Sequence, residues 1–574
     1  MGTKGRSKLV RREFLALSVS AVAALLETAC GGSTPPAPTT AAPQVASTSG
    51  SSSGLTPSAA GATRSVGNAA ATSAPAASGT RTSAPAKRGG TINYAEGGDF
   101  NNFNPWTVSA TNLNIYNQVF SRLLWKDDQG KENPDIAESW QLSPDGLSFT
   151  VKMRQGVKWH DGKPCTADDF VAMFAYTKDP DLLKDATIKK QQGLFDPIQE
   201  VQASDPLTLQ FRFKNPVPYI TDILDYWFAI RIEDKSDVSM LKKLPVATGP
   251  FKMEQWVPNQ FAKMSKNDGF YRTGQPYVDT FMFKRLDKAE TLIPNLQSGT
   301  LDGIQITSLS DVDPLKADQR YNVVVNESAG STFNIIVNVT KPPFDKKEVR
   351  QALSYSLNRV GMAKSAYFGI SRPITSPFFS PSSLAYREDL VMAHPFDLTK
   401  ASALLKGAGV TTLEMTTNVT PRWPQMKLFC LIWQQDLAKL GIKLNINEVE
   451  IAKFYDIAAA KDLQGNAIQP WVNGRTTRDP AIFWSTQTNF RGNEKNVYGY
   501  QNPELEKLVA AGAIELDTEK RRQIYQQLNQ IVVDESYMIS VANDPRVWAF
   551  TKTTNGVHFD LNGNLFLDTT WMNR

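Results

Sequence analysis

Residues 133–176 read NPDIAESWQLSPDGLSFTVKMRQGVKWHDGKPCTADDFVAMFAY and contain a turn, a strand and the start of a helix in close succession. The tetrapeptide Ser-Pro-Asp-Gly at 143–146 is typical of a β-turn. Apolar residues then alternate with polar ones, which predicts a half-buried strand. Its inner face would carry Leu147, Phe149, Val151 and Met153. The run FVAMFAY that ends the stretch predicts a helix.

The same stretch places the residue types that bind metals and transfer protons within ten positions: His160, Asp161, Cys165, Asp168 and Asp169. One hypothesis is therefore a metal or catalytic centre. However, Asp161-Gly162 is a turn signal, and Thr166 and Asp169 have the spacing of a capping box, although Glu or Gln is usual at the later position. Asp168 also suits the positive end of a helix. We therefore interpret the cluster as a helix start.

Cysteine and histidine are scarce, with three of each in 574 residues: Cys30, Cys165, Cys430, His160, His394 and His558. Within the globular part only Cys165 and Cys430 could pair, and the sequence does not decide whether they do. The inventory argues against a closed zinc site, and His-Glu-x-x-His does not occur. Gly-x-Ser-x-Gly occurs at 50–54, within a Ser-rich run and not between a strand and a helix, so no nucleophile elbow is visible. We expect no metal and no cofactor, and an exported metal-dependent hydrolase is a remote alternative.

The formal net charge of +5 is unevenly distributed along the chain. Residues 1–88 carry nine Lys or Arg against two acids, whereas the rest of the chain carries 53 basic against 55 acidic side chains. The body therefore lacks the basic excess of nucleic-acid-binding proteins, and we expect no nucleic-acid partner.

The N-terminus predicts export. A basic segment precedes an apolar stretch at 14–26, which is too short to span a bilayer but typical of a signal peptide. Cys30 stands among small residues and resembles the lipidated cysteine of bacterial lipoproteins, although Glu27 occupies the usual Leu position. The run RREFL at 11–15 resembles a twin-arginine signal. An ordinary secretory leader is the alternative.

The predicted signal peptide covers 1–30, and 31–88 form a linker rich in Ser, Thr, Pro and Ala. Such a composition cannot bury enough apolar surface to offset its ordering entropy, so we expect disorder. Its root-mean-square reach is about 40 Å. This layout predicts a monomer tethered by lipid to the outer face of the cytoplasmic membrane or located in the periplasm.

From residue 89 onward, the chain alternates strand and helix patterns. The stretch GGTINYAEGG at 89–98 predicts a first strand with Ile92 and Tyr94 buried. Period-3.6 patterns predict helices over 346–367, 426–441 and 503–535. Short strands between these helices indicate an α/β fold with more than one sheet.

Several segments of the chain resemble one known family. The opening stretch resembles the signature region of extracellular solute-binding proteins of family 5, the peptide, nickel and oligosaccharide receptors of ABC importers. Further segments resemble the family in its order: GGTINYAEGGDFNNFNPW (89–106), ATGPFKMEQWVPNQ (247–260), KNDGFY (266–271), LQSGTLDG (296–303), FNIIVNVTKPPFDKKEVRQALSYSLNR (333–359) and FDLTKASALLKGAG (396–409).

The resemblance implies a class II periplasmic-binding-protein fold with an extra domain, in which two lobes close over a ligand at a hinge. Lobe I would combine 89–131, 249–333 and 545–574. The extra domain II would be 132–248, and lobe III would be 334–544. The implied partners are a peptide or small-molecule ligand and a membrane permease, and the implied function is capture and delivery without chemistry.

The segment WVNGRTTRDPAIFW, at 471–484, departs from the peptide-binding members of the family. These members carry an Asp that holds the ammonium group of the peptide, and here Thr476 stands at that position. A hydroxyl supplies no counter-charge for a buried ammonium. A peptide-like solute is the main hypothesis, and an oligosaccharide or other non-peptide solute is the alternative.

Ligand contacts are expected from aromatic residues that stack on rings or accept apolar groups, and from polar residues near the cleft. The candidates are Asn101, Phe103, Asn104, Tyr226, Trp227, Asn338, Trp423, Trp471, Thr476 and Trp484. For each tryptophan taken singly, a place in the core is the competing interpretation.

Overall fold

The computed structural model describes the globular body of the chain and a small part of what precedes it. The described residues are 87–97, 100, 103–104, 110–184, 193–232, 244–286, 288–327, 331–474 and 478–574. The predicted signal peptide, Cys30 and nearly all of the linker lie outside them. None of the helices in the described part has the length and apolarity that a bilayer crossing requires.

A seven-stranded sheet collects strands from three distant stretches of the chain. In spatial order its strands are β12 (Tyr321–Asn326), β18 (Arg546–Thr551), β11 (Gly303–Ile306), β1 (Thr91–Glu96), β10 (Thr280–Arg285), β9 (Phe261–Lys266) and β8 (Phe251–Val257). β1 lies parallel to both of its neighbours, and its inner residues Ile92 and Tyr94 are fully buried, as the alternation predicts. These strands come from the three segments assigned to lobe I.

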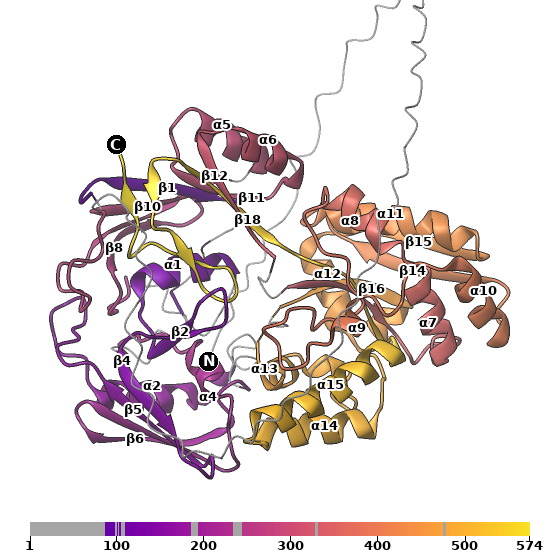
Figure 1. Ribbon diagram of the computed structural model, residues 1–574, viewed down its shortest axis with the longest axis horizontal. Helices are drawn as coiled ribbons and strands as arrows, with labels where there is room; N and C mark the ends of the chain where they lie inside the picture. Colours follow the sequence, from indigo (N-terminus) through magenta and orange to yellow (C-terminus); the bar gives the residue numbers. More distant parts are fainter. Residues whose placement is uncertain are drawn as a thin grey trace, which may run out of the picture. The chain divides into compact units, whose positions relative to one another are not determined.

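Short helices flank this sheet. α5 (Leu292–Gln297) and α6 (Val312–Ala317) lie against β11 and β12 (Figure 1). α1 (Ala110–Val119) packs on β8 and on a hairpin near the C-terminus. The small strand pairs nearby are β2 (Leu124–Lys126) with β3 (Glu132–Pro134), β19 (Thr554–Asn555) with β22 (Trp571–Met572), and β20 (His558–Phe559) with β21 (Leu565–Phe566).

A second, antiparallel sheet is formed by strands within residues 137–213. Its order is β4 (Ala137–Leu142), β5 (Ser148–Met153), β7 (Thr208–Phe213) and β6 (Ile198–Asp205), with α2 (Ala167–Thr177) against β6. Phe149, Val151 and Met153 are buried as expected. The expectation for Leu147 was wrong, because it precedes β5 and is 39% exposed.

The metal-like cluster begins α2, as the capping interpretation predicts. Asp169 accepts a hydrogen bond from the backbone N–H of Thr166 at 2.8 Å, and Nε1 of Trp159 donates to the same carboxylate at 3.2 Å. Asp161 accepts from the backbone of Lys163 at 3.2 Å and pairs with Arg231 at 2.7 Å. Asp161 and Asp169 thus both have structural partners.

The third region has a three-stranded sheet of order β16 (Ile468–Asn473), β13 (Thr332–Val337) and β17 (Met538–Asn543), and a parallel pair, β14 (Leu413–Val419) with β15 (Ile442–Glu448). Every residue of β13 is buried, because helices cover both faces of its sheet. The helices are α7 (Lys347–Tyr355), α8 (Arg359–Ala366), α9 (Glu388–Val391), α10 (Leu398–Gly407), α11 (Pro424–Ala438), α12 (Ile451–Ala459), α13 (Pro480–Thr486), α14 (Pro503–Ile514) and α15 (Thr518–Glu535).

Two of the three predicted helices are each divided in two. The predicted helix over 346–367 breaks between α7 and α8, where the side chain of Asn358 caps the second helix through the N–H of Gly361. The predicted helix over 503–535 breaks before α15, where Asp517 accepts from two backbone N–H groups at 2.9 Å. In both cases the apolar period continues across the break, so the prediction joined two helices that a polar capping side chain separates.

The chain crosses between the seven-stranded and three-stranded sheets twice, once from β12 to β13 and once from β17 to β18. The two crossings are hydrogen-bonded to each other. Nδ2 of Asn543 donates to the carbonyl of Glu327 at 2.7 Å, and the N–H of Asp544 donates to the carbonyl of Ser331 at 2.9 Å. Such paired segments are where a hinge between lobes is expected.

We predict that Asp169→Ala lowers the free energy of unfolding by about 1–2 kcal/mol, because it removes the cap of α2 and the partner of Trp159. Urea unfolding followed by circular dichroism measures the change. Asp168→Ala is the matched control, since Asp168 lies in the same first turn but is exposed. Equal losses in the two variants would contradict a specific role for Asp169.

Candidate functional site

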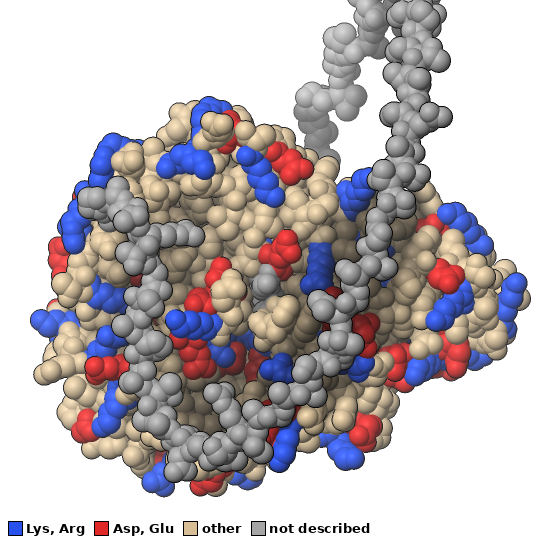
Figure 2. All heavy atoms as spheres, viewed as in Figure 1, with Lys and Arg blue, Asp and Glu red and all other residues tan. Residues whose placement is uncertain are grey.

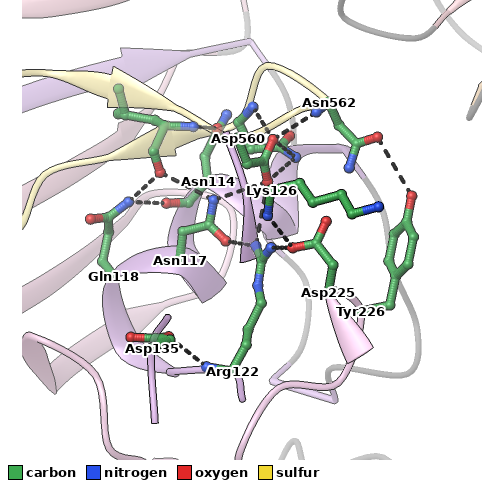
Figure 3. Close-up of polar contacts among 12 residues, drawn as sticks. Asn114, Asn117, Gln118, Arg122, Lys126, Asp135, Asp225, Tyr226, Asp560 and Asn562 are labelled. Carbon is green, nitrogen blue, oxygen red and sulfur yellow. Dashed lines mark hydrogen bonds and ion pairs between the residues drawn. The ribbon is translucent and has the colours of Figure 1, made fainter. Parts of the chain in front are cut away.

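α1 directs a row of polar side chains toward the C-terminal hairpin. Asn114 and Gln118 lie one helical turn apart and therefore share a face. Gln118 Nε2 donates to the carbonyl of Leu565 at 2.7 Å, and Asn114 Oδ1 accepts from its N–H at 2.9 Å (Figure 3). Arg122 continues this row just beyond the helix end and reaches into the protein interior.

The Arg122 guanidinium is the first member of a buried ion network. Its side chain is 3% exposed and forms an ion pair with Asp225, a short hydrogen bond with Asn117 and a 3.4 Å contact with Asp560 (Figure 3). The backbone N–H of Arg122 also donates to Asp135 at 2.8 Å. The network therefore joins α1 to the extra domain and to the C-terminal hairpin.

Arg478, from the segment predicted as lobe III, meets the same carboxylate from the other side. Its Nη2 lies 2.5 Å from Oδ2 of Asp225, and both side chains are fully buried. Nη1 lies 3.6 Å from Asp222, the guanidinium stacks on Tyr226 at 4.4 Å, and Nε donates to Asn562 at 3.2 Å. Burial alone raises the pKa of the Asp225 carboxyl, but Arg478 and Arg122 outweigh it and the pKa is lowered.

Asp222 and Asp225 are three residues apart around α4 (Ile220–Leu224), which places both carboxylates on one face. Asp222 also binds the ammonium group of Lys126 at 2.5 Å, and Glu132 lies 3.8 Å from that ammonium. Oγ of Thr221 donates to Glu132 at 2.5 Å. The acidic face of α4 thus receives cations from two directions.

A cavity of about 220 Å³ adjoins the network. Its walls are Lys126, Gly130, Glu132, Pro218, Thr221, Asp222, Ser382, Leu384, Arg478, Asp479 and Leu561. Asp479 caps α13 and pairs with Arg521 at 2.8 Å. Burial raises the pKa of the Asp479 carboxyl even though Arg521 opposes the shift. The cavity is therefore lined by charges of both signs that segments from all three predicted domains contribute.

Of the predicted ligand contacts that the structure describes, Tyr226 is the one that lies in this network. Trp423 and Trp471 instead meet in a second cluster with Phe454 and Tyr455, at centroid distances of 5.7–6.1 Å. Tyr455 is 43% exposed there, and both tryptophans are half-buried.

The other described candidates are buried in the packed interior. Trp227 packs among Phe174, Phe195 and Phe211, and Trp484 packs against Phe378 and Phe483. In this conformation neither indole presents surface to a ligand.

The remaining candidates are polar or lie near the first loop. Phe103 packs edge-on against Trp256, and the carbonyl of Asn104 accepts from Tyr116. Asn338 donates to the backbone carbonyls of Asp462 and Asn466. Asn101 and Thr476 lie outside the described residues.

The sequence patterns did not predict the charged members of this network. The spacing of Asp222 and Asp225 carried a weak signal, since two acids three residues apart in an apolar stretch indicate a shared buried face. Their partners Arg122 and Arg478 are hundreds of residues apart and share no pattern with them.

Among the described residues, no group of three or more His, Cys, Asp or Glu side chains is arranged to hold a metal ion. Cys165 and Cys430 are both free and buried. Burial raises the pKa of the Cys430 thiol to about 12, so it is protonated at neutral pH. His160 binds the carbonyl of Gly249 at 3.1 Å rather than a cluster of ligands.

Comparison with known families gives a match over most of the body. The sequence profile described as bacterial extracellular solute-binding proteins, family 5 Middle, matches residues 131–494. Among curated relatives, the glutathione-binding protein GsiB of Salmonella paratyphi A is 26% identical over 486 residues, which cover 82% of this chain and 92% of that protein. GsiB of Escherichia coli K12 is 25% identical, covering 80% and 90%.

Solved structures share the fold. The substrate-binding protein CtaP from Listeria monocytogenes superposes with a TM-score of 0.74 at 24% identity, covering 85% of this chain and all of that one. DppA from Helicobacter pylori, solved with the peptide STSA, gives a TM-score of 0.72 at 22% identity, covering 85% and 99%. These matches extend over both predicted lobes and the extra domain.

We predict that stability falls as the pH is lowered from 6.5 to 4. Burial lowers the pKa of His160 to about 4, and burial together with Arg359 lowers that of His394 to about 4. In this window the unfolded chain binds protons that the folded chain excludes, so the free energy of unfolding decreases with falling pH.

Urea midpoints of the wild type and His160→Gln at pH 7.0, 5.5 and 4.5 measure this effect. The Gln amide retains a donor for the Gly249 carbonyl, and we expect a shallower decline with falling pH. His394→Asn, whose amide can hydrogen-bond with Ser354 as either donor or acceptor, should flatten the decline independently. Identical pH slopes in all three proteins would show that the histidines are not responsible. Solute binding at pH 7 should be unchanged in His160→Gln.

Proposed function

Because this chain belongs to the bacterial extracellular solute-binding proteins of family 5, we propose that it is the substrate-binding receptor of an ABC importer. In this role it captures a peptide-like solute between two closing lobes and delivers it to a membrane permease. The observation that carries the proposal is the buried contact of Arg478 with Asp225, beside a charged cavity to which both sides contribute. Relatives named for glutathione and peptide ligands support the peptide-like class.

The mechanism we infer is differential binding. A solute that touches both sides of the cavity stabilises the closed arrangement, and the permease would distinguish that arrangement from the open one. The cavity offers cations from Lys126 and Arg478 and carboxylates from Asp222 and Asp479, so it suits a polar solute with several amide or hydroxyl groups. On this proposal the protein performs no reaction on its cargo.

A carbohydrate or other non-peptide solute is the second candidate, and the aromatic cluster of Trp423, Tyr455 and Trp471 favours it. Partly exposed indole and phenol rings suit stacking on apolar faces of sugar rings. Arg422 lies 5.7 Å from the ring of Trp423 and could donate hydrogen bonds at its edge.

We also propose that the protein acts outside the cytoplasm as a monomer, at the outer face of the cytoplasmic membrane or in the periplasm. The basic and apolar leader supports export, and Cys30 among small residues supports lipid attachment. A linker with a reach of about 40 Å would let the body move over the membrane while remaining near its permease.

We predict that native mass spectrometry of the purified protein reveals co-purifying short peptides, which denaturation releases for identification. Asp225→Asn should lose this cargo, because it removes the carboxylate shared by Arg122 and Arg478 and weakens closure. Asp318→Asn is the control, since the Asp318–Arg320 pair lies at the surface. A single sugar-like mass would favour the second candidate, and failure to bind any peptide or sugar in calorimetry would contradict the receptor proposal.

A further inference from the structure

The buried part of the ion network is electrically balanced without a ligand, and Glu132, 35% exposed and 3.8 Å from Lys126, lies at its edge. Three cations face three carboxylates in side chains that are at most 13% exposed: Arg122, Lys126 and Arg478 against Asp222, Asp225 and Asp560. The adjoining pair of Asp479 and Arg521 is balanced as well. A charged group that enters among these buried side chains would therefore have to displace an existing ion pair to gain a counter-charge, which is costly in a buried site.

The balance depends on one residue from the opposite side of the cavity. Arg122 and Lys126 belong to the same side as the three carboxylates, which leaves that side with one carboxylate in excess. Arg478, carried by the segment that follows β16, supplies the missing positive charge. A positive group of a solute would have to compete with this guanidinium for Asp222 and Asp225.

The contacts of Arg478 indicate how firmly it occupies this place. Nη1 lies 3.6 Å from Asp222 and Nη2 lies 2.5 Å from Asp225. The hydrogen bond from Nε to Asn562 and the stacking on Tyr226 hold the guanidinium in this orientation. The side chain therefore provides positive charge at the acidic face of α4.

We propose that Arg478 is a specificity-determining residue: a tethered cation that fills the acidic face of α4 and makes the receptor favour solutes whose cavity-facing group is uncharged. This inference rests on the proposed receptor function and deepens it by naming the ligand class. A blocked or amide-rich end of a peptide-like solute fits, whereas a free ammonium duplicates the charge of Arg478. A free carboxylate would face Asp222 and Glu132 as like charges, while the cations Lys126 and Arg478 are already paired with Asp222 and Asp225.

The test uses two probes that differ at the amino terminus, tetra-alanine amide with a free, charged amine and its uncharged N-acetylated counterpart. Isothermal titration calorimetry gives both affinities for the full protein and for Arg478→Gln. We expect the wild type to bind the acetylated peptide about tenfold more tightly. Arg478→Gln should shift this preference about tenfold toward the free amine, because one carboxylate then lacks its cation.

A charge-conserving variant keeps the test independent of folding. Arg478→Lys retains a cation at the acidic face and should keep the preference for the acetylated probe. Arg491→Gln is the matched control, since Arg491 pairs with Glu506 elsewhere in the same lobe, and its preference should equal that of the wild type. Thermal melts of all variants report on folding.

The outcomes separate the two proposals. If both peptides bind but the preference is the same in wild type and Arg478→Gln, or the wild type favours the free amine, the role of Arg478 is refuted and the receptor function stands. If neither peptide binds any variant while all are folded, the peptide-like ligand class fails and the inference about Arg478 falls with it.

Discussion

Asp225 held between two buried arginines is the interaction on which the rest of the site depends. Arg122 approaches from the end of α1 and Arg478 from the segment after β16, and both contacts exclude water. Removing one partner of such a group typically costs about 3–5 kcal/mol, because an uncompensated charge remains buried. Because these charges are desolvated, the ion pairs are favourable only when the end of α1, the end of α4 and the segment after β16 lie close together.

Two crossings of the chain connect the seven-stranded and three-stranded sheets. They are hydrogen-bonded to each other through Asn543 and Asp544. On one side, β13 is buried on both faces and cannot deform without disturbing two hydrophobic clusters. Motion is therefore expected at the crossings, with rigid sheets on either side.

Positive and negative side chains are interspersed on the face of the molecule that Figure 2 shows. Such a surface suits a protein that binds a polar solute rather than a polyanion.

The cluster from His160 to Asp169 shows how residue types mislead when read without geometry. His, Cys and Asp are the common metal ligands, yet Asp169 caps α2, Asp161 closes a turn and pairs with Arg231, and Cys165 is buried in the core. These roles arise from positions relative to a strand end and a helix start, which the sequence itself displays. The charged residues that do converge, Arg122, Asp225 and Arg478, have no local pattern of this kind.

Local patterns determined the strands around Ile92 and Phe149, the helix start at Thr166 and the α/β class, because alternation and capping act over a few residues. The order of the family-like motifs then predicted the type of fold, a two-lobed binding protein with an extra domain. The 3.6-residue period did not predict the helix breaks at Asn358 and Asp517, because a single capping side chain ends or begins a helix without changing the apolar pattern.

Tertiary structure alone decided which charges meet: Arg122, Asp225 and Arg478 are separated by 103 and 253 positions. It also decided that Trp423 joins Trp471 while Trp227 and Trp484 are buried. Contacts between distant segments depend on how whole sheets and helices pack, and no short stretch of sequence encodes that packing.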